Sequence, residues 1–198
     1  MAQGFWNTLV NLAAPGTAIA ASAARTSMTV GSTQARYTMP GNLLKMPGDQ
    51  LLIEASGIIS TVAAANTETI DIAFGTTANL STGALPLVNG ISTNSPWYLR
   101  MLATAFTLGS GTAAQLRFTG YIIGYPFFNT ALPATGPGPG GNMIPYSGTA
   151  TGASTLGTTF DSTVSNQIDI YATCSVATAG TSIQLLQYSV SLLTATGF

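Results

Sequence analysis

Residues 97–124 read WYLRMLATAFTLGSGTAAQLRFTGYIIG. Two long alternating runs flank the short stretch LGSGT (108–112), whose glycines can adopt the positive φ angles of a hairpin turn. In the second run, Leu116, Phe118 and Ile122 fall on one side of an extended chain and the residues between them on the other. The stretch therefore predicts a long β-hairpin.

Similar alternation, with β-branched and aromatic residues, recurs along the chain after residue 25. It predicts strands at 26–30, 34–39, 50–59, 67–74, 97–108, 113–124, 165–174 and 181–193. In the strand at 67–74, Ile70, Ile72 and Phe74 share one face. Glu68 is therefore expected to point inward with them or to lie at the strand edge, whereas Asp71 takes the opposite face.

Near the end of the chain, Leu186, Tyr188, Val190 and Leu192 alternate with polar residues and are expected on one face. The stretch Ala177-Thr178-Ala179-Gly180 predicts a second hairpin, between the last two strands.

Two connections, 75–96 and 125–164, are long, and the second contains the Gly/Pro tract 132–141. Proline lacks the amide donor of a central strand, so this tract is expected as a surface loop or a crossing between sheets. Short hairpins that alternate with long crossings are typical of a Greek-key sandwich or jelly roll. The predicted fold is all-β, with a single jelly-roll or Greek-key β-sandwich of about eight strands in residues 26–198.

Residues 1–25 are predicted to form an N-terminal arm. An apolar cluster that includes Phe5, Trp6 and Leu9 can form one or two helical turns before Pro15. We expect the arm to dock on a neighbouring subunit, the alternative being that it packs on its own domain. The first basic residue is Arg25, so the charged start of a signal peptide is missing and we expect assembly in a host cytoplasm.

Charge is scarce, since only 6% of the residues are charged, against roughly 25% in an average soluble domain. With a net charge of -1 and no basic cluster, we expect neither nucleic acid nor a membrane surface as a partner. Few charges protect a monomer poorly against association. The composition therefore predicts a surface largely covered by neighbouring molecules, the alternative being a thermophilic or secreted monomer with an uncharged polar surface.

Groups suited to catalysis are few. Histidine is absent, which removes the commonest general base and zinc ligand. Among the scattered carboxylates, Asp161 and Asp169 are the remaining sequence-local candidates for a catalytic pair, because Glu68 and Asp71 project to opposite faces. The single Cys174 lies in an alternating segment and is expected to be buried as a free thiol. We expect no enzyme activity, no cofactor and no metal site.

Aromatic residues cluster around the ends of the predicted long hairpin. Trp97 and Tyr98 open its first strand, and Tyr125, Phe127 and Phe128 follow the second. Buried, such residues are core; exposed, they form a platform for sugars or a contact with a subunit. We expect the corner of Tyr125, Phe127 and Phe128 to be an interface.

The stretch QLLIEASGIIS (50–60) and the run from Pro96 to Gly120 resemble virion proteins of tailed phages. Such proteins are decoration (capsid cement) or minor structural proteins with a jelly-roll sandwich. The resemblance covers about residues 26–124. It implies a homotrimer on the outer surface of the capsid, seated on the major capsid protein where shell subunits meet.

Three alternatives remain open at this point. The main one is a tail or fibre module that binds host carbohydrate through Trp97, Tyr98 or Tyr125. The others are a polysaccharide depolymerase that uses Asp161 or Asp169, and a main shell-forming jelly-roll subunit.

Overall fold

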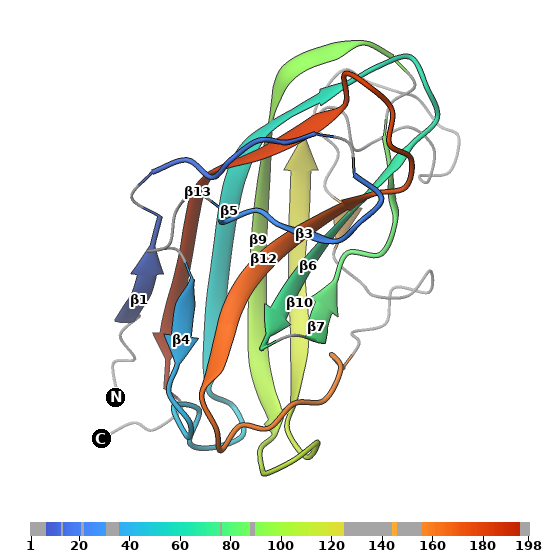
Figure 1. Ribbon diagram of the computed structural model, residues 1–198. Coiled ribbons are helices and arrows are strands. Elements are labelled where there is room, and N and C mark those ends of the chain that lie inside the picture. Colours follow the sequence, from blue (N-terminus) through green and yellow to red (C-terminus); the bar gives the residue numbers. More distant parts are fainter. Residues whose placement is uncertain are drawn as a thin grey trace.

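The computed structural model describes residues 7–12, 14–20, 22–30, 36–75, 77–87, 90–124, 144–145 and 156–194, without the side chains of 77–79 and 144–145. These residues form two antiparallel sheets that face each other across one hydrophobic core (Figure 1). No helix occurs in the described ranges. The predicted all-β sandwich is confirmed.

The larger sheet, sheet A, contains the long hairpin expected at 97–124. Its strand order is β1 (Asn7–Asn11), β13 (Ser182–Leu193), β5 (Gln50–Thr61), β9 (Ser92–Thr107), β10 (Gln115–Gly124) and β11 (Ile144–Pro145), and β2 (Ile19–Ala20) also pairs with β13.

Sheet B is smaller. Its order is β3 (Thr26–Ser27), β12 (Asn166–Cys174), β6 (Thr67–Phe74) and β7 (Thr77–Ser81), with β4 (Tyr37–Met39) also paired with β12 and β8 (Leu85–Pro86) with β6.

The order of the strands is that of a jelly roll. The last strand, β13, lies between β1 and β5 in sheet A, and β12 lies between β3 and β6 in sheet B. The two final strands are thus each inserted between strands from the first half of the chain, which closes two nested Greek keys. Strands β10 and β11 extend sheet A beyond this unit.

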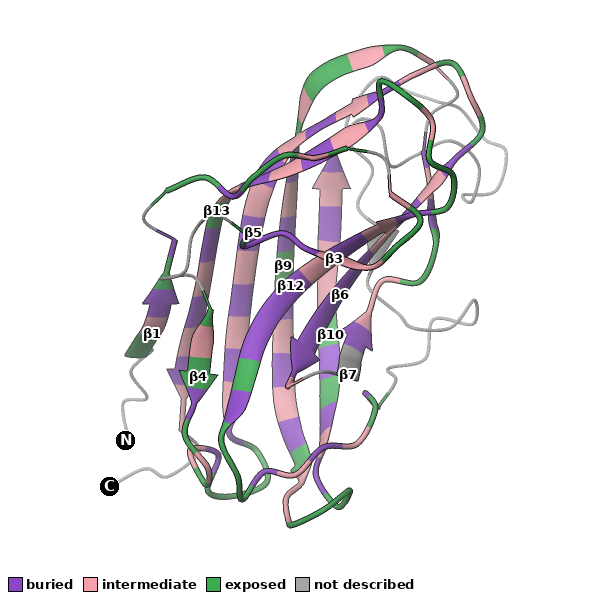
Figure 2. Ribbon diagram, viewed as in Figure 1, coloured by how far each residue is buried: buried purple, intermediate pink, exposed green. Residues whose placement is uncertain are grey.

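Alternating burial along the long strands explains why the sheets pack (Figure 2). In β5, every second residue from Leu51 to Thr61 is buried, and the residues between are half-buried. The inward side chains of both sheets form a single core, which also includes the stacked rings of Phe74 and Phe160, 5.2 Å apart between centroids. Burial of this kind stabilises a fold by about 25 cal/mol per Å² of apolar surface.

Gly57 is required by a close approach within sheet A. It pairs with Trp97 across β5 and β9, and a Cβ at position 57 would lie 2.9 Å from the indole ring and 1.9 Å from the carbonyl oxygen of Gln184. The glycine thus leaves room for the indole of Trp97, which is only 2% exposed. Trp97 is therefore a core residue and is excluded as an exposed sugar-binding residue.

The expected hairpin at 177–180 is wrong. Strand β12 belongs to sheet B and β13 to sheet A, so residues 175–181 carry the chain from one sheet to the other. Gly180 has a φ of 93° in this turn. A turn signal of this kind fits a tight reversal within a sheet and a short crossing between sheets equally well.

The N-terminal helical turns are also wrong where the structure describes them. Residues 7–11 form β1, which pairs with β13, and the amide of Leu12 donates a hydrogen bond to the carbonyl of Tyr188. Val10 and Leu12 are buried in the core. The edge of β13 offers unpaired backbone groups to this segment, and that pairing overrides the local tendency to form a helix.

Two smaller expectations need correction. The supposed connection 75–96 contains β7, β8 and the first residues of β9. A β-bulge in β13 between Leu185 and Gln187 shifts the alternation, so Leu185 is buried and Leu186 is only half-buried. One extra residue in a strand reverses the side to which the following residues point, which the sequence pattern did not reveal.

Candidate functional site

The outward side of sheet A is the broadest regular surface of the described chain, and we call it the open face. Its side chains are all half-buried or exposed. They are Gln50, Leu52, Glu54, Ser56 and Ile58 on β5; Tyr98, Arg100, Leu102 and Thr104 on β9; Arg117, Thr119, Tyr121 and Ile123 on β10; and Gln187, Ser189, Ser191 and Leu193 on β13.

Glu54 lies near the middle of the open face. Cross-strand pairing places it opposite Arg100, whose Nε is 3.7 Å from a Glu54 carboxylate oxygen. The same oxygen accepts a 2.6 Å hydrogen bond from the hydroxyl of Tyr98. Burial, and then the hydrogen bond to Glu54, raises the pKa of Tyr98 to about 12, so this hydroxyl stays protonated and remains a donor at neutral pH.

Tyr98 and Tyr121 form an aromatic pair on the open face. Their ring centroids lie 6.1 Å apart with an interplanar angle of 50°. Both rings come from adjacent strands of the long hairpin, and the register pairs Tyr98 with Ile123 and Tyr121 with Arg100. The rings thus lie beside the ion pair and offer apolar contact area with polar ends.

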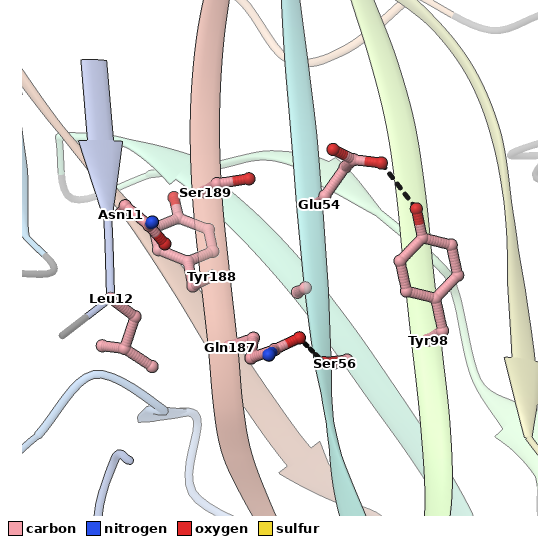
Figure 3. Close-up of a pocket in the computed structure, with 9 residues that line it drawn as sticks. Asn11, Leu12, Glu54, Ser56, Tyr98, Gln187, Tyr188 and Ser189 are labelled. Carbon is pink, nitrogen blue, oxygen red and sulfur yellow. Dashed lines mark hydrogen bonds between the residues drawn. The ribbon is translucent and has the colours of Figure 1, made fainter. Parts of the chain in front are cut away.

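An open groove of about 400 Å³ runs over β5 and β13 beside Tyr98 (Figure 3). Polar side chains line it, and within it Ser56 donates a 3.1 Å hydrogen bond to the amide oxygen of Gln187. The lining residues are Asn11, Leu12, Glu54, Ala55, Ser56, Tyr98, Gln187, Tyr188 and Ser189. Hydroxyl, amide and carboxylate groups next to an aromatic ring suit the recognition of a polar ligand or of a protein surface.

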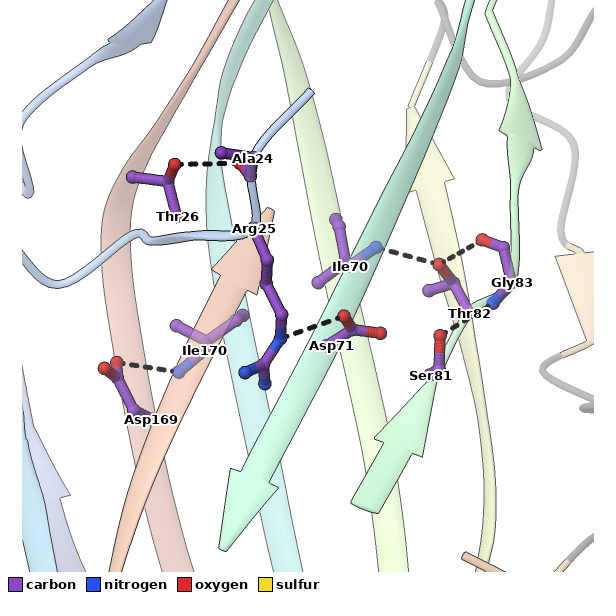
Figure 4. A network of polar contacts seen from close by, with 10 residues as sticks. All are labelled: Ala24, Arg25, Thr26, Ile70, Asp71, Ser81, Thr82, Gly83, Asp169 and Ile170. Carbon is purple, nitrogen blue, oxygen red and sulfur yellow. Dashed lines mark hydrogen bonds and ion pairs between the residues drawn. The ribbon is translucent and has the colours of Figure 1, made fainter. Parts of the chain in front are cut away.

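The outward side of sheet B is built differently, because charged groups there fasten the chain to itself (Figure 4). Arg25 lies 3.2 Å from a carboxylate oxygen of Asp71, and its guanidinium stacks 3.7 Å above the ring of Tyr171. Asp169 accepts hydrogen bonds from the Thr29 hydroxyl at 2.7 Å and from the Ile170 amide at 2.8 Å.

A further ion pair completes this surface, with Arg36 Nε 3.5 Å from the other carboxylate oxygen of Asp169. Asp169 is 1% exposed. The Arg36 side chain is 38% exposed, so the pair lies at the boundary between the protein interior and solvent. The two pairs therefore attach Arg25 and Arg36 to strands β6 and β12 of sheet B.

The carboxylates proposed as a catalytic pair lie in different settings. Asp169 is buried against Arg36, whereas Asp161 lies in an exposed turn and accepts hydrogen bonds from the amides of Gly111 and Thr163. The Thr163 hydroxyl donates to it as well and holds the pKa of Asp161 below its ordinary value. Both carboxylates are thus engaged in hydrogen bonds that stabilise local structure.

Glu68 and Cys174 face each other inside the sandwich, as expected from the alternation. They are paired across β6 and β12, and both are buried. The amide nitrogen of Asn66 donates to the sulfur at 2.9 Å. Burial raises the pKa of Glu68 to about 7 and also raises the pKa of the Cys174 thiol, so the thiol stays protonated at neutral pH.

Of the expected interface residues, the structure describes Leu9 alone. Leu9 lies on β1, is half-buried, and packs against the core of its own chain. The others, Phe5, Trp6, Tyr125, Phe127 and Phe128, lie outside the described residues.

The sequence did not predict that the outward residues of these strands form one continuous surface. The signal that could have found it is the outward half of each alternating strand, where Leu52, Ile58, Leu102 and Ile123 stand at positions that are normally polar in a one-sided sheet. Only the strand order shows that these positions lie side by side.

Comparison with known proteins gives little. No protein-family model matches the chain, and no curated protein matches it in sequence. Among solved structures, the chain is similar to the CBM2 module of the evolved Dit of Lactobacillus casei BL23 phage J-1. The TM-score is 0.35 and the identity 8%, over 99% of this chain and 100% of that chain. At that TM-score and identity, nothing about the function of this chain follows. Within the described ranges, no helix has the length and apolar character needed to cross a membrane.

Proposed function

We propose that this chain is a structural protein of a phage particle, which decorates the outside of the capsid by binding across neighbouring subunits of the major capsid protein, as a homotrimer. The observation that carries the proposal is how the charged side chains are used. Three of the five basic side chains, Arg25, Arg36 and Arg100, form ion pairs within the chain.

The remaining surface of sheet A is rich in serine, threonine, glutamine, tyrosine and aliphatic side chains. Docking such a surface on another protein removes few charges from water, so the desolvation cost is low. A rigid sandwich that binds only the assembled lattice stabilises that lattice by mass action. Three copies around one site would repeat a modest contact, so that avidity replaces a single strong interface.

Binding to empty shells tests the proposal. Purified chain is mixed with shells that lack it, the shells are sedimented, and the bound chain is quantified as its concentration rises. We expect saturation at a fixed ratio to the major capsid protein and a higher temperature of shell disruption. A chain that stays in the supernatant and leaves the disruption temperature unchanged would contradict the proposal.

The groove beside Tyr98 favours a second candidate, a tail or fibre module that binds host-surface carbohydrate. Aromatic rings with nearby amide and carboxylate groups are suited to sugars, which offer an apolar ring face and hydroxyl groups. Glycan arrays with wild type and Tyr98→Ala test this candidate, which requires retention by a host polysaccharide and loss of that retention in the variant. Copy number in the particle separates the two candidates, since decoration proteins are abundant and tail modules are rare.

A further inference from the structure

The two outward sides of the sandwich differ in a way that a monomer does not explain. On sheet B, the outward residues of β6 and β12 include no large aliphatic side chain; they are Thr67, Thr69, Asp71 and Ala73, and Gln167, Asp169, Tyr171 and Thr173. On the open face of sheet A, leucine and isoleucine recur in outward positions. Both sheets cover the same core, so the difference in outward side chains reflects the surroundings of each sheet.

The aliphatic residues of the open face are adjacent in space. Leu52 pairs with Leu102 across β5 and β9, and Leu102 pairs with Thr119 on β10. On the other side of the ion pair, Ile123 pairs directly with Tyr98, and Ile58 lies on the next outward row of β5, opposite Pro96. Aromatic and aliphatic side chains together, with few charges, are the composition of the centre of a protein–protein interface.

The size of the open face fits a stable contact. Strand β5 has 12 residues, which at about 3.3 Å each span about 40 Å. Four neighbouring strands at about 4.8 Å spacing are about 19 Å wide. The resulting area of roughly 760 Å² is close to the roughly 800 Å² that each partner contributes to a standard interface.

Charge on the open face points to a second copy of this chain as the occupant. Glu54 and Arg100 neutralise each other within the face. Arg117 lies with its guanidinium 5.1 Å from the ring centroid of Phe106, and it is the remaining charged residue among the open-face side chains. A surface this close to neutral does not repel its own copy, and it offers no field that would select an oppositely charged partner.

We propose that the open face of sheet A is the surface through which copies of this chain associate with one another, with Leu52, Leu102, Tyr98 and Tyr121 near the centre of the contact. The inference deepens the proposed function, on which its biological role rests, by naming the surface that joins the copies. It leaves the opposite surface and the ends of the sandwich for contact with a shell. The groove beside Tyr98 is then filled by side chains of the neighbouring copy.

Size-exclusion chromatography with multi-angle light scattering tests the inference over a dilution series. Wild type is expected at a multiple of the chain mass of 20.2 kDa. Leu102→Glu places a charge in the centre of the contact and is expected to run as a monomer. The matched control Gln167→Glu places the same charge on the outward side of sheet B, at an exposed position, and is expected to keep the wild-type mass.

Thr119→Glu is a second test variant, which keeps the inference testable if Leu102→Glu fails to fold. Thr119 is exposed on β10 beside Leu102, so a charge there disturbs no core packing. At the dilutions where wild type begins to dissociate, Thr119→Glu is expected to have a lower molar mass than wild type. Its far-ultraviolet circular dichroism spectrum is expected to be unchanged. The inference is overturned if wild type is a monomer at every concentration, or if folded Leu102→Glu and Thr119→Glu both keep the wild-type mass.

Shell binding is measured on the same proteins, which separates this inference from the proposed function. A monomeric wild type that still saturates shells overturns the self-association inference and the homotrimer, and leaves capsid binding itself standing. If wild type self-associates and Leu102→Glu is a monomer, but wild type does not bind shells, the result supports the inference and contradicts decoration. A monomeric wild type retained by glycans through Tyr98 overturns the inference in favour of a carbohydrate site.

Discussion

Glu68 makes the stability of this protein depend on pH in an unusual direction. The residue is 2% exposed, inside the sandwich next to Cys174, and burial raises the pKa of its carboxyl from 4.5 to about 7. Because the folded pKa is the higher one, the folded state holds a proton between these two values that the unfolded state has released. The stabilisation is therefore full below pH 4.5, declines as the pH rises to about 7, and is lost above it.

The size of the effect follows from the two pKa values. Each tenfold change in proton affinity corresponds to about 1.4 kcal/mol, so the rise from 4.5 to about 7 corresponds to about 3 kcal/mol as an upper figure. Replacing the carboxyl with an amide of the same shape removes the ionisable group. We expect Glu68→Gln to be more stable than wild type by up to about 3 kcal/mol at pH 8 and to differ little from it at pH 4.5.

Urea unfolding followed by tryptophan fluorescence between pH 4.5 and pH 8, at one protein concentration, measures the difference. The buried indole of Trp97 reports on the core. Glu54→Gln is the matched control, since it removes a carboxylate from the open face and retains Glu68, and it should keep the wild-type slope. If Glu68→Gln shows the same pH slope as wild type, or is less stable at pH 8, the reasoning about the buried carboxyl is wrong.

Three further predictions concern stability. Gly57→Ala is expected to cost about 1–3 kcal/mol or more, because its Cβ would meet the indole of Trp97 and a backbone carbonyl; chemical denaturation of this variant and wild type measures the loss. Asp169→Asn removes the buried charge that pairs with the 38% exposed Arg36 and weakens the hydrogen bond from Thr29, so thermal unfolding should show a loss of about 1.5–3 kcal/mol, and an unchanged melting temperature would contradict this role. Asp161→Ala removes the acceptor of several turn hydrogen bonds; because the pKa of Asp161 is lowered in the fold, the resulting drop in melting temperature should be present at neutral pH and shrink as the pH falls below 3.8.

The Asp169 prediction also affects how a depolymerase test is interpreted. A loss of activity in Asp169→Ala would follow from loss of the fold as readily as from loss of a catalytic group, because this carboxylate binds Thr29 and Arg36. Melting curves of every such variant are therefore needed beside any activity measurement.

Local pattern in the sequence determined the strands themselves. Alternation at 50–59, 67–74 and 113–124 predicts strands that the structure contains, and the glycines of 108–112 predict the hairpin between β9 and β10. It also predicted Glu68 either inside with Ile70 and Ile72 or at the strand edge, and the structure has it inside, because side-chain direction in a strand has a period of two residues.

Tertiary structure alone decided which strands meet. The turn at 177–180 has the residues of a hairpin, yet it joins two sheets, because β12 and β13 each find better partners among strands from the first half of the chain. The bulge at Leu186 and the pairing of β1 with β13 have the same origin. Pairing is a long-range choice made by the packing of the whole core, so the open face, which spans four strands, exists only once that choice is made.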